Sequence, residues 1–294
     1  MHAASNKKSK HRMQVMYAWC AVAFFSLVLV VLWGAYGKHD RGGDLQVVFF
    51  DVGQGDSIFI ETPQGVQVLV DGGKGRAVLR ELGKKLSFFD RTIDMVVATH
   101  PDLDHIGGLP EVLTRYHVRS YLSSDINDDG ADNRALLEAL DNEGAIVTTV
   151  TKPQSFLLDK DVRLDVLFPD REVSAVDVNT GSVVLRLSYG STSFLLTGDA
   201  PSAIETYLVS LYGETLKSTV LKLGHHGSNT SSSLAFLGYV SPEYAVVSAG
   251  CDNSYGHPHR EVLERLQSFE VTVFDTCTYG SITFVSDGKE VVTK

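Results

Sequence analysis

Four apolar segments of the sequence end in residues that can carry out chemistry. They are Leu69–Gly73, Val96–His105, Leu195–Asp199 and Leu221–Ser228. In α/β proteins, ligands bind at the carboxyl ends of the strands. Each segment alone also has an ordinary explanation, because an Asp before Gly commonly forms a turn and paired His residues can simply lie at the surface. Their shared arrangement predicts a functional site at the ends of several strands.

The second segment has the strongest chemical character. Four potential metal ligands fall within six residues: His100, Asp102, Asp104 and His105. Carboxylates crowded in this way repel one another unless a cation lies between them. Imidazole and carboxylate together form a ligand set for Zn²⁺ or Mn²⁺. We therefore predict a metal site here in preference to a solvated turn.

The order of the motifs resembles that of the metallo-β-lactamase superfamily. The residues that carry the resemblance are Asp71, the series His100-x-Asp102-x-Asp104-His105, Asp199 and His225. Within that superfamily, residues 51–56, 197–199, 225–228 and 255–258 resemble motifs in the hydrolase domain of ComEC-type competence proteins. The resemblance covers nearly the whole domain. It implies an α/β fold, the four-layer αββα metallo-β-lactamase sandwich, with the metals at its edge.

The resemblance also implies a ligand set for one or two divalent metal ions. The expected ligands are His100, Asp102, Asp104, His105, Asp199, His225 and His257. The first two are expected to bind one ion, and Asp104, His105 and His257 the other. Asp199 is expected to bridge the two ions. His225 is expected to face either a metal or the substrate.

Three residues are expected to serve the reaction directly: Asp71, Asp104 and Ser228. Asp71 is expected to orient the metal ligands from behind. Ser228 lies just before a predicted helix, where hydroxyls and main-chain N–H groups can hold a phosphate oxygen. Ordinary helix capping explains Ser228 equally well.

The sequence departs from the superfamily pattern at two positions. Most members carry a His where this chain has Asp102, and another His between the second and fourth motifs. Here the only His between those motifs is His117, which we expect to be structural, and the nearest replacement is Asn179. The first metal site is therefore oxygen-rich. This favours Mn²⁺ or Mg²⁺ over Zn²⁺ there and leaves occupancy by a single metal open.

Several neighbouring residues have two interpretations that the sequence leaves open. His226 suits structural support as well as metal binding, and His259 is expected to be a helix cap or a surface residue. The Gly-rich segment 51–56 lacks the Lys followed by Ser or Thr of a phosphate-binding loop. It forms either a tight turn or, through Gln54 or Asp56, part of the rim of the site.

Alternating strands and helices predict an α/β domain. Strands are expected near residues 45–50, 57–61, 66–70, 94–99, 182–188, 193–197, 219–223, 244–248, 271–274 and 281–285. Helices are expected near residues 75–86, 109–116, 133–143, 202–211, 231–240 and 259–269. A hairpin pattern that ends at Asp71 recurs with its end at Asp199, which favours two related halves.

The stretch from Val15 to Tyr36 contains no charged residue. At about 1.5 Å per helical residue it covers the ~30 Å hydrocarbon core of a bilayer. A cleaved signal has a shorter apolar region, so we expect one retained transmembrane helix. Basic residues concentrate before it, which places the amino terminus in the cytoplasm and the domain outside. The expected division is a basic tail (1–14), a transmembrane anchor (15–36), a linker (37–44) and a hydrolase domain (45–294).

Charge and cysteine content limit the function further. Four of the 26 Lys and Arg residues lie in the first 37 residues, so the remainder carries 22 basic against 36 acidic residues. Such a domain is not a general electrostatic trap for nucleic acid. Lys74, Arg76 and Lys222 are the basic residues nearest the expected site. Cys251 and Cys277 are expected to be two separate buried thiols in preference to a disulfide.

Two divalent metals about 3.5–4 Å apart can lower the pKa of a shared water to near neutrality and offset charge on the attacked centre. The same chemistry opens phosphodiesters, lactams and lactones. The resemblance implies phosphodiester cleavage, with DNA as the substrate class. Two alternatives remain: a hydrolase of a small molecule such as a lactam, a lactone or an envelope phosphoester, and a metal-stabilised module without catalysis.

Overall fold

The computed structural model describes residues 2–39 and 43–294, and the chain forms two compact units, residues 1–43 and 44–294. In the first unit, α1 (His2–His39) is a single long helix. Its segment Arg12–Val31 has a mean hydropathy of 2.1, which suits a membrane span or a signal sequence. The linker predicted for residues 37–44 includes residues 40–42, which lie outside the described residues.

The described part of the second unit contains two mixed sheets. The first has eight strands in the order β15-β14-β1-β2-β3-β4-β5-β6, and the second has seven in the order β13-β12-β11-β10-β9-β8-β7. The strands of the first sheet are β1 (Leu45–Phe49), β2 (Ile58–Glu61), β3 (Gln67–Val70), β4 (Thr92–Ala98), β5 (His117–Ser124), β6 (Ile146–Val150), β14 (Ile282–Ser286) and β15 (Val291–Thr293). Those of the second are β7 (Gln154–Asp159), β8 (Val162–Phe168), β9 (Val184–Tyr189), β10 (Thr192–Leu196), β11 (Val220–Lys222), β12 (Tyr244–Val247) and β13 (Thr272–Asp275).

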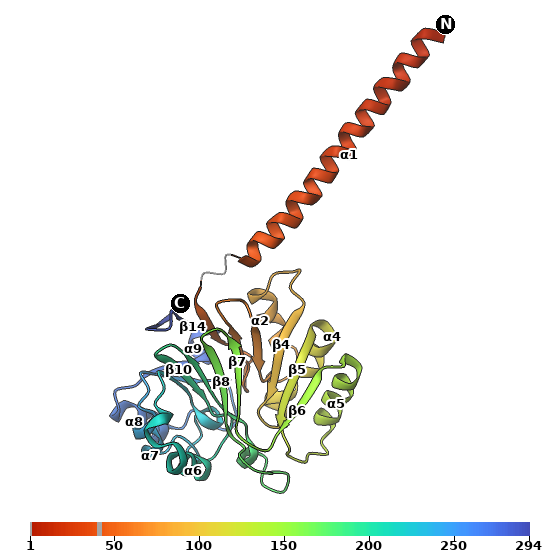
Figure 1. Cartoon of the computed structure of the whole chain (residues 1–294). Helices are drawn as coiled ribbons and strands as arrows, with labels where there is room; N and C mark the ends of the chain where they lie inside the picture. Colours follow the sequence, from red (N-terminus) through yellow and green to blue (C-terminus); the bar gives the residue numbers. More distant parts are fainter. Residues whose placement is uncertain (1, 40–42) are drawn as a thin grey trace. The chain divides into compact units, whose positions relative to one another are not determined.

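Helices cover the outer face of each sheet (Figure 1). On the first sheet lie α2 (Ala77–Lys85), α4 (Leu109–Arg115) and α5 (Ala131–Glu143). On the second lie α6 (Ser202–Tyr212), α7 (Leu234–Val240) and α8 (Arg260–Ser268). Shorter helical turns occur in the connections: α3 (Leu103–Ile106), α9 (Thr276–Tyr279), η1 (Asn179–Gly181), η2 (Gly213–Leu216) and η3 (Gly224–Gly227).

Three apolar layers hold these elements together, one between the sheets and one beneath each set of helices. Side chains alternate between the two faces of a strand. In β1, Val47 and Phe49 therefore enter the layer between the sheets, whereas Val48 enters the layer beneath the helices. The layers follow the order helix, sheet, sheet, helix. The predicted four-layer αββα sandwich is confirmed.

The two sheets repeat one topology. In the first, β2 and β3 form an antiparallel hairpin, and β3 to β6 run parallel. In the second, β9 and β10 form the hairpin, and β10 to β13 run parallel. The hairpins lead to Asp71 and Asp199, the two residues at which the repeated hairpin pattern of the sequence ends. Because parallel strands end at the same edge of a sheet, this topology collects the predicted functional segments.

No strand was predicted from the sequence at β5, β6, β7, β8 or β15. Strands β6 and β7 are edge strands of their sheets, and most of their side chains are at least partly exposed. Exposed edges carry polar residues, so their composition resembles that of loops. In β8, the buried residues Val162, Leu164 and Val166 alternate with more exposed ones, which is the period of a strand.

The expectation of two separate buried thiols at Cys251 and Cys277 was wrong. Both residues are exposed, and their sulfur atoms form a disulfide with the Cα atoms 4.9 Å apart. The bond joins the loop after β12 to α9. Their separation of 26 residues in sequence gave no sign of this proximity, because the intervening helix α8 returns the chain to the same edge of the sheet.

Phe284 tests the layer between the sheets. Its ring has four aromatic neighbours at centroid distances of 5.7 to 6.2 Å: Phe49, Phe194, Tyr244 and Phe274. We expect Phe284→Ala to lower the free energy of unfolding by about 3–5 kcal/mol because it leaves a cavity. The control Phe88→Ala removes a ring that is 77% exposed and should change it by less than ~0.5 kcal/mol. Denaturant unfolding followed by circular dichroism measures both, and equal effects would contradict the assigned core.

Candidate metal centre

The ionisable residues at the strand ends meet at one edge of the two sheets. Asp71 and residues 100–105 follow β3 and β4 of the first sheet, whereas Asp199 and residues 225–226 follow β10 and β11 of the second. The two groups touch, since Nε2 of His105 lies 3.3 Å from Oδ1 of Asp199. The edge of the sandwich therefore carries one site built from both sheets.

The Asp71 carboxylate organises the histidines of the first sheet. Its two oxygens accept hydrogen bonds from Thr99 N at 2.8 Å and Thr99 Oγ1 at 2.7 Å. His105 Nδ1 lies 2.8 Å from the same carboxylate and donates to it. Because Thr99 Oγ1 gives its proton to Asp71, it accepts from His100 Nδ1 at 3.0 Å. Protons are thus held on both Nδ1 atoms, which leaves both Nε2 atoms available as metal ligands.

His226 is oriented in the same way from the second sheet. Its Nδ1 donates to the main-chain oxygen of Ser248 at 2.8 Å. Its Nε2 lies 3.3 Å from Nε2 of His105 and 3.3 Å from Oδ2 of Asp104. When both rings are neutral, their protons sit on Nδ1, so the two Nε2 atoms cannot hydrogen-bond to each other. Their lone pairs instead face a shared point that suits a cation.

The donor set at this point fits a divalent metal. The ligand atoms of Asp56, His105, Asp199 and His226 all lie within 4.8 Å of one another, and all four residues are buried. Among the described residues, Oδ1 of Asp56 and Oδ1 of Asp199 have no hydrogen-bond partner. Burial disfavours a charged His226, but the carboxylates of Asp199 and Asp56 outweigh it and raise the pKa of His226 to about 9. The cluster therefore attracts positive charge, and imidazole with carboxylate is the ligand set for Zn²⁺ or Mn²⁺.

Asp56 belongs to this cluster, although its sequence context predicted only a turn or the rim of the site. Its buried carboxylate is paired with the ammonium group of Lys222, which is fully buried. Burial alone would raise the pKa of Asp56, but the charges of Lys222 and His226 lower it. The segment of Asp56 also lies close to Asp104. Gly55 permits this approach, because a Cβ at that position would lie 2.0 Å from the main-chain oxygen of Asp104. This contact between distant segments leaves no mark in the sequence.

The expected ligands His100 and Asp102 lie beside each other at the margin of the cluster. Nε2 of His100 is 3.5 Å from Oδ2 of Asp102 and 3.9 Å from Oδ2 of Asp199. The His100 side chain is buried, whereas that of Asp102 is 49% exposed. This half of the centre therefore has a buried side and a side that is open to solvent.

His225 and His257 form the outer part of the site. Nε2 of His225 lies 3.7 Å from Oδ2 of Asp199, and the His225 and His257 ring centroids are 5.5 Å apart. Burial, helped by the charges of His225 and His226, lowers the pKa of His257 to about 4. Its imidazole is therefore neutral at neutral pH, with a lone pair available for a metal.

Other candidate residues lie outside the cluster, and two of them contact its outer part: Ser228 N donates to His225 O at 2.8 Å, and the His259 ring lies 4.9 Å from that of His257. Ser228 is buried, and its hydroxyl accepts hydrogen bonds from a neighbouring threonine. Asn179 has a buried Oδ1 without a partner among the described residues, so its role as a replacement ligand stays a prediction. His117 pairs with Glu143 at the beginning of β5, away from the site. His259 precedes α8 and accepts a hydrogen bond from a main-chain N–H.

Three residues of the metal centre have a left-handed backbone conformation. The φ angles are 59° at Asp71, 51° at His225 and 55° at His226. Residues other than Gly and Asn rarely adopt this conformation, which costs about 1–3 kcal/mol and occurs often at functional sites. After β11, this backbone conformation turns the side chains of His225 and His226 in different directions, and their ring planes are 72° apart. His226 enters the cluster, and His225 stays at its edge.

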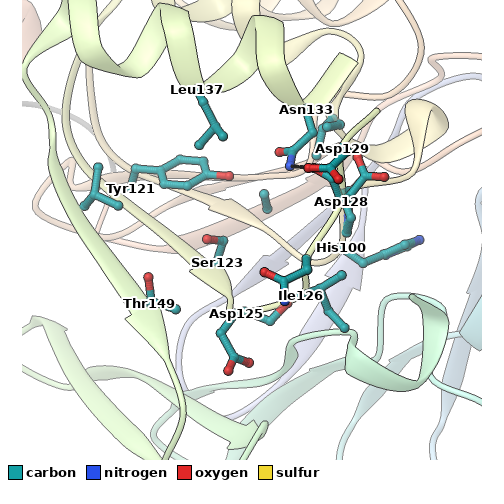
Figure 2. Close-up of a pocket in the computed structure, with 16 residues that line it drawn as sticks. His100, Tyr121, Ser123, Asp125, Ile126, Asp128, Asp129, Asn133, Leu137 and Thr149 are labelled. Atoms are coloured by element: carbon teal, nitrogen blue, oxygen red, sulfur yellow. Dashed lines mark hydrogen bonds between the residues drawn. The ribbon is translucent and has the colours of Figure 1, made fainter. Parts of the chain in front are cut away.

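Two cavities adjoin the centre. The larger, about 450 Å³, lies beside His100 at the ends of β4, β5 and β6. Figure 2 shows Tyr121 and Leu137 on one side of it, while the His100 ring points away from them. Its acidic lining residues are Asp125, Asp128 and Asp129. The smaller, about 320 Å³, includes Asp104 and the loop after β12.

Comparison with known proteins agrees with this geometry. Residues 50–250 match the sequence profile of the metallo-β-lactamase superfamily. The chain is 31% identical to ComE operon protein 3 of Bacillus subtilis (strain 168) over 300 aligned positions, which cover 96% of this chain and 37% of that protein. It is 35% identical to competence protein ComA of Neisseria gonorrhoeae over 239 positions, which cover 81% of this chain and 32% of that protein. The chain thus spans about a third of the length of these relatives.

A solved structure shows the same fold. The metallo-β-lactamase fold protein YhfI from Bacillus subtilis superposes with a TM-score of 0.56 at 14% sequence identity. The superposition covers 83% of this chain and 100% of YhfI. At this level of identity, the likeness concerns the fold and not the activity.

The two adjacent histidines provide a matched test of the centre. We expect His226→Ala and Asp199→Ala to remove bound metal, because both side chains reach the point where the Nε2 atoms converge. His225→Ala should lower the metal content less, since that ring lies at the edge. Elemental analysis of the dialysed protein measures metal per chain, and thermal unfolding checks that each variant is folded. Full metal content in His226→Ala with loss in His225→Ala would move the centre outward.

Proposed function

We propose that this chain, which belongs to the metallo-β-lactamase superfamily, uses divalent metal to hydrolyse phosphodiesters, with DNA as its substrate. The observation that carries the proposal is the convergence of His105 Nε2 and His226 Nε2 on the Asp199 carboxylate, at distances of 3.3 and 3.5 Å. The relative named competence protein ComA supports DNA as the substrate class. Because the chain spans only about a third of their length, their activities are not transferred as a whole.

The proposed ligand sets follow the two halves of the centre. One ion would be held by His105, His226, Asp104 and Asp56, and the other by His100 and Asp102, with Asp199 between them. The expected ligand His257 lies at the outer edge of this set, beside His225. When bound, such ions lower the pKa of water and offset charge on a phosphoryl group. Asp71 would keep a proton on Nδ1 of His105, so that the ring binds through Nε2.

The balance of oxygen and nitrogen ligands favours phosphodiesters over lactams. Asp102 supplies a carboxylate where most superfamily members have a His, so the half of the centre around His100 is rich in oxygen. Oxygen ligands suit Mn²⁺ and Mg²⁺, the hard cations that also bind phosphoryl oxygens. Zn²⁺ is better suited to the half formed by His105 and His226.

The local charges favour short contacts with the substrate. Of the basic residues expected near the site, Arg76 pairs with Glu111 and Lys222 with Asp56. Lys74 has no ion pair within the described part of the chain. A surface with so few free cations contacts few phosphates, so affinity should be modest and salt-sensitive. Short or single-stranded substrates should therefore serve about as well as long duplexes.

Initial rates on three substrates test the reaction class. We expect cleavage of bis-p-nitrophenyl phosphate and of a single-stranded oligonucleotide with Mn²⁺, Mg²⁺ or Zn²⁺, and little turnover of a chromogenic cephalosporin. Asp104→Ala should lower the phosphodiesterase rate about 10- to 100-fold through the loss of a metal ligand. The control Asp287→Ala changes an exposed carboxylate remote from the centre and should retain the rate.

The acidic cavity beside His100 favours the alternative function, hydrolysis of a small molecule. Its three aspartates would repel a polyanion and would accept a small neutral or cationic substrate. Metal-dependent cephalosporin turnover with no phosphodiester cleavage under any metal would overturn the proposal in favour of a small-molecule hydrolase. Bound metal without hydrolysis of any substrate would favour a metal-stabilised module.

We also propose that α1 anchors the chain in the cell membrane and that the hydrolase domain lies outside the cytoplasm. The basic residues before Val15 support this orientation. A protease added to intact cells, or to spheroplasts where there is an outer membrane, should degrade the domain. Complete protection, with an external marker protein degraded in the same cells, would reverse the orientation.

A further inference from the structure

The cavity beside Asp104 has the composition of a substrate subsite. Its volume is about 320 Å³, and it is lined by Gln54, Lys74, Leu103, Asp104 and residues 252–255. These residues come from the β1–β2 turn, the segment after β3, the beginning of α3 and the loop after β12. Since Asp104 also lies 3.3 Å from His226, the cavity adjoins the metal centre directly.

Lys74 gives this cavity a free cation. Its side chain is exposed and makes no ion pair with any other residue that the structure describes. The main chain beside it is fixed, because Gly73 N donates to Asp56 O at 2.8 Å and Gly108 N donates to Gly73 O at 2.8 Å. The larger cavity beside His100 is lined by three aspartates and by no described Lys or Arg. Of the two cavities, the one with Lys74 is therefore suited to a phosphate.

Tyr255 gives the same cavity an aromatic surface. Its side chain is 62% exposed, and its ring lies nearly parallel to that of His257, with centroids 5.6 Å apart and an interplanar angle of 21°. The imidazole covers part of one face, and the large exposure leaves ring surface free. Proteins that bind single-stranded nucleic acid stack bases on aromatic rings of this kind.

The loop that carries Tyr255 is held in place by contacts at both ends. Asn253 Nδ2 donates to His257 O at 2.7 Å, and Asn253 Oδ1 accepts from His257 N at 2.9 Å. Gln54 Oε1 accepts from Gly250 N at 3.3 Å, and the disulfide at Cys251 ties the loop to α9. A surface held in this way loses little conformational entropy when a ligand binds.

We infer that this cavity binds one nucleotide unit of the substrate, with the base on Tyr255 and a phosphate on Lys74. The inference rests on the proposed phosphodiesterase function and assigns the residues that would hold one nucleotide of its substrate. Asp252 determines which way round the nucleotide lies in the cavity. Its exposed carboxylate shares a loop with Tyr255, where it repels phosphate and accepts hydrogen bonds from base N–H groups.

Two esters with the same leaving group test the base contact. Thymidine 5′-(p-nitrophenyl phosphate) and methyl p-nitrophenyl phosphate differ in the nucleoside alone. With the full-length, metal-loaded protein, Tyr255→Ala should lower kcat/KM for the thymidine ester about tenfold, mainly through KM, and leave the methyl ester within about twofold. Tyr279→Ala, which removes a ring that is 61% exposed on α9, is the matched control and should change neither.

Binding to the metal-free protein tests the same subsite without catalysis. Fluorescein-labelled oligo(dT) of eight nucleotides, titrated in EDTA, should bind about tenfold more weakly to Tyr255→Ala and to Lys74→Met. Lys74→Met should also reduce the slope of log K against log salt by about 0.7, as expected for one lost phosphate contact on a single strand. The control Lys289→Met changes an exposed lysine outside the cavity. Competition by thymidine 5′-monophosphate at comparable concentration would assign the subsite to free nucleotides; competition by oligonucleotides alone would assign it to a strand.

The outcomes separate this inference from the function on which it rests. Phosphodiester cleavage with equal effects of Tyr255→Ala and Tyr279→Ala on both esters would overturn the subsite and leave the function standing. If the wild-type protein cleaves no phosphodiester with any metal, the proposed function fails and the binding titration alone decides the subsite. In that titration, unchanged affinity in both Tyr255→Ala and Lys74→Met would overturn it.

Discussion

The hydrogen bonds of the Asp71 carboxylate determine the orientation of the His100 and His105 rings in the centre. They hold the Nδ1 proton of His105 directly and that of His100 through Thr99, so that Nε2 of each ring is free. Asp71 is able to do this because it ends β3 in a left-handed conformation beside the parallel strand β4. The hairpin and the parallel pairing thus place Asp71, and Asp71 in turn orients the imidazoles.

The buried charges of the centre need cations from more than one source. Asp56 is neutralised inside the protein by Lys222, whereas the ion-pair partners of Asp199 among the described residues are imidazoles. Without metal, burial disfavours charge on His105, but Asp199 and Asp71 raise its pKa well above the usual value. A divalent ion would take the place of such protons, which explains why so acidic a cluster is compatible with a well-packed fold.

The surroundings of the centre are asymmetric. Three aspartates and no described Lys or Arg line the cavity beside His100, whereas the other cavity combines Asp104 and Asp252 with a free lysine and an exposed tyrosine. The second cavity depends on a loop that a disulfide and the Asn253 hydrogen bonds hold against the β1–β2 turn. In an acidic domain, selectivity of this kind has to come from local placement and not from net charge.

The sequence by itself determined the fold class and the segments of the site. Strand periodicity and strand-end motifs are local patterns, so they can be recognised without knowledge of the tertiary contacts. It also located Asp71, the 100–105 series, Asp199 and the paired histidines near one edge. Only the tertiary structure decided which histidine of the pair faces inward, since that depends on two consecutive left-handed residues. It alone brought Asp56 and Lys222 together and joined Cys251 to Cys277, because these contacts link segments whose proximity arises from packing of the two sheets and their connections.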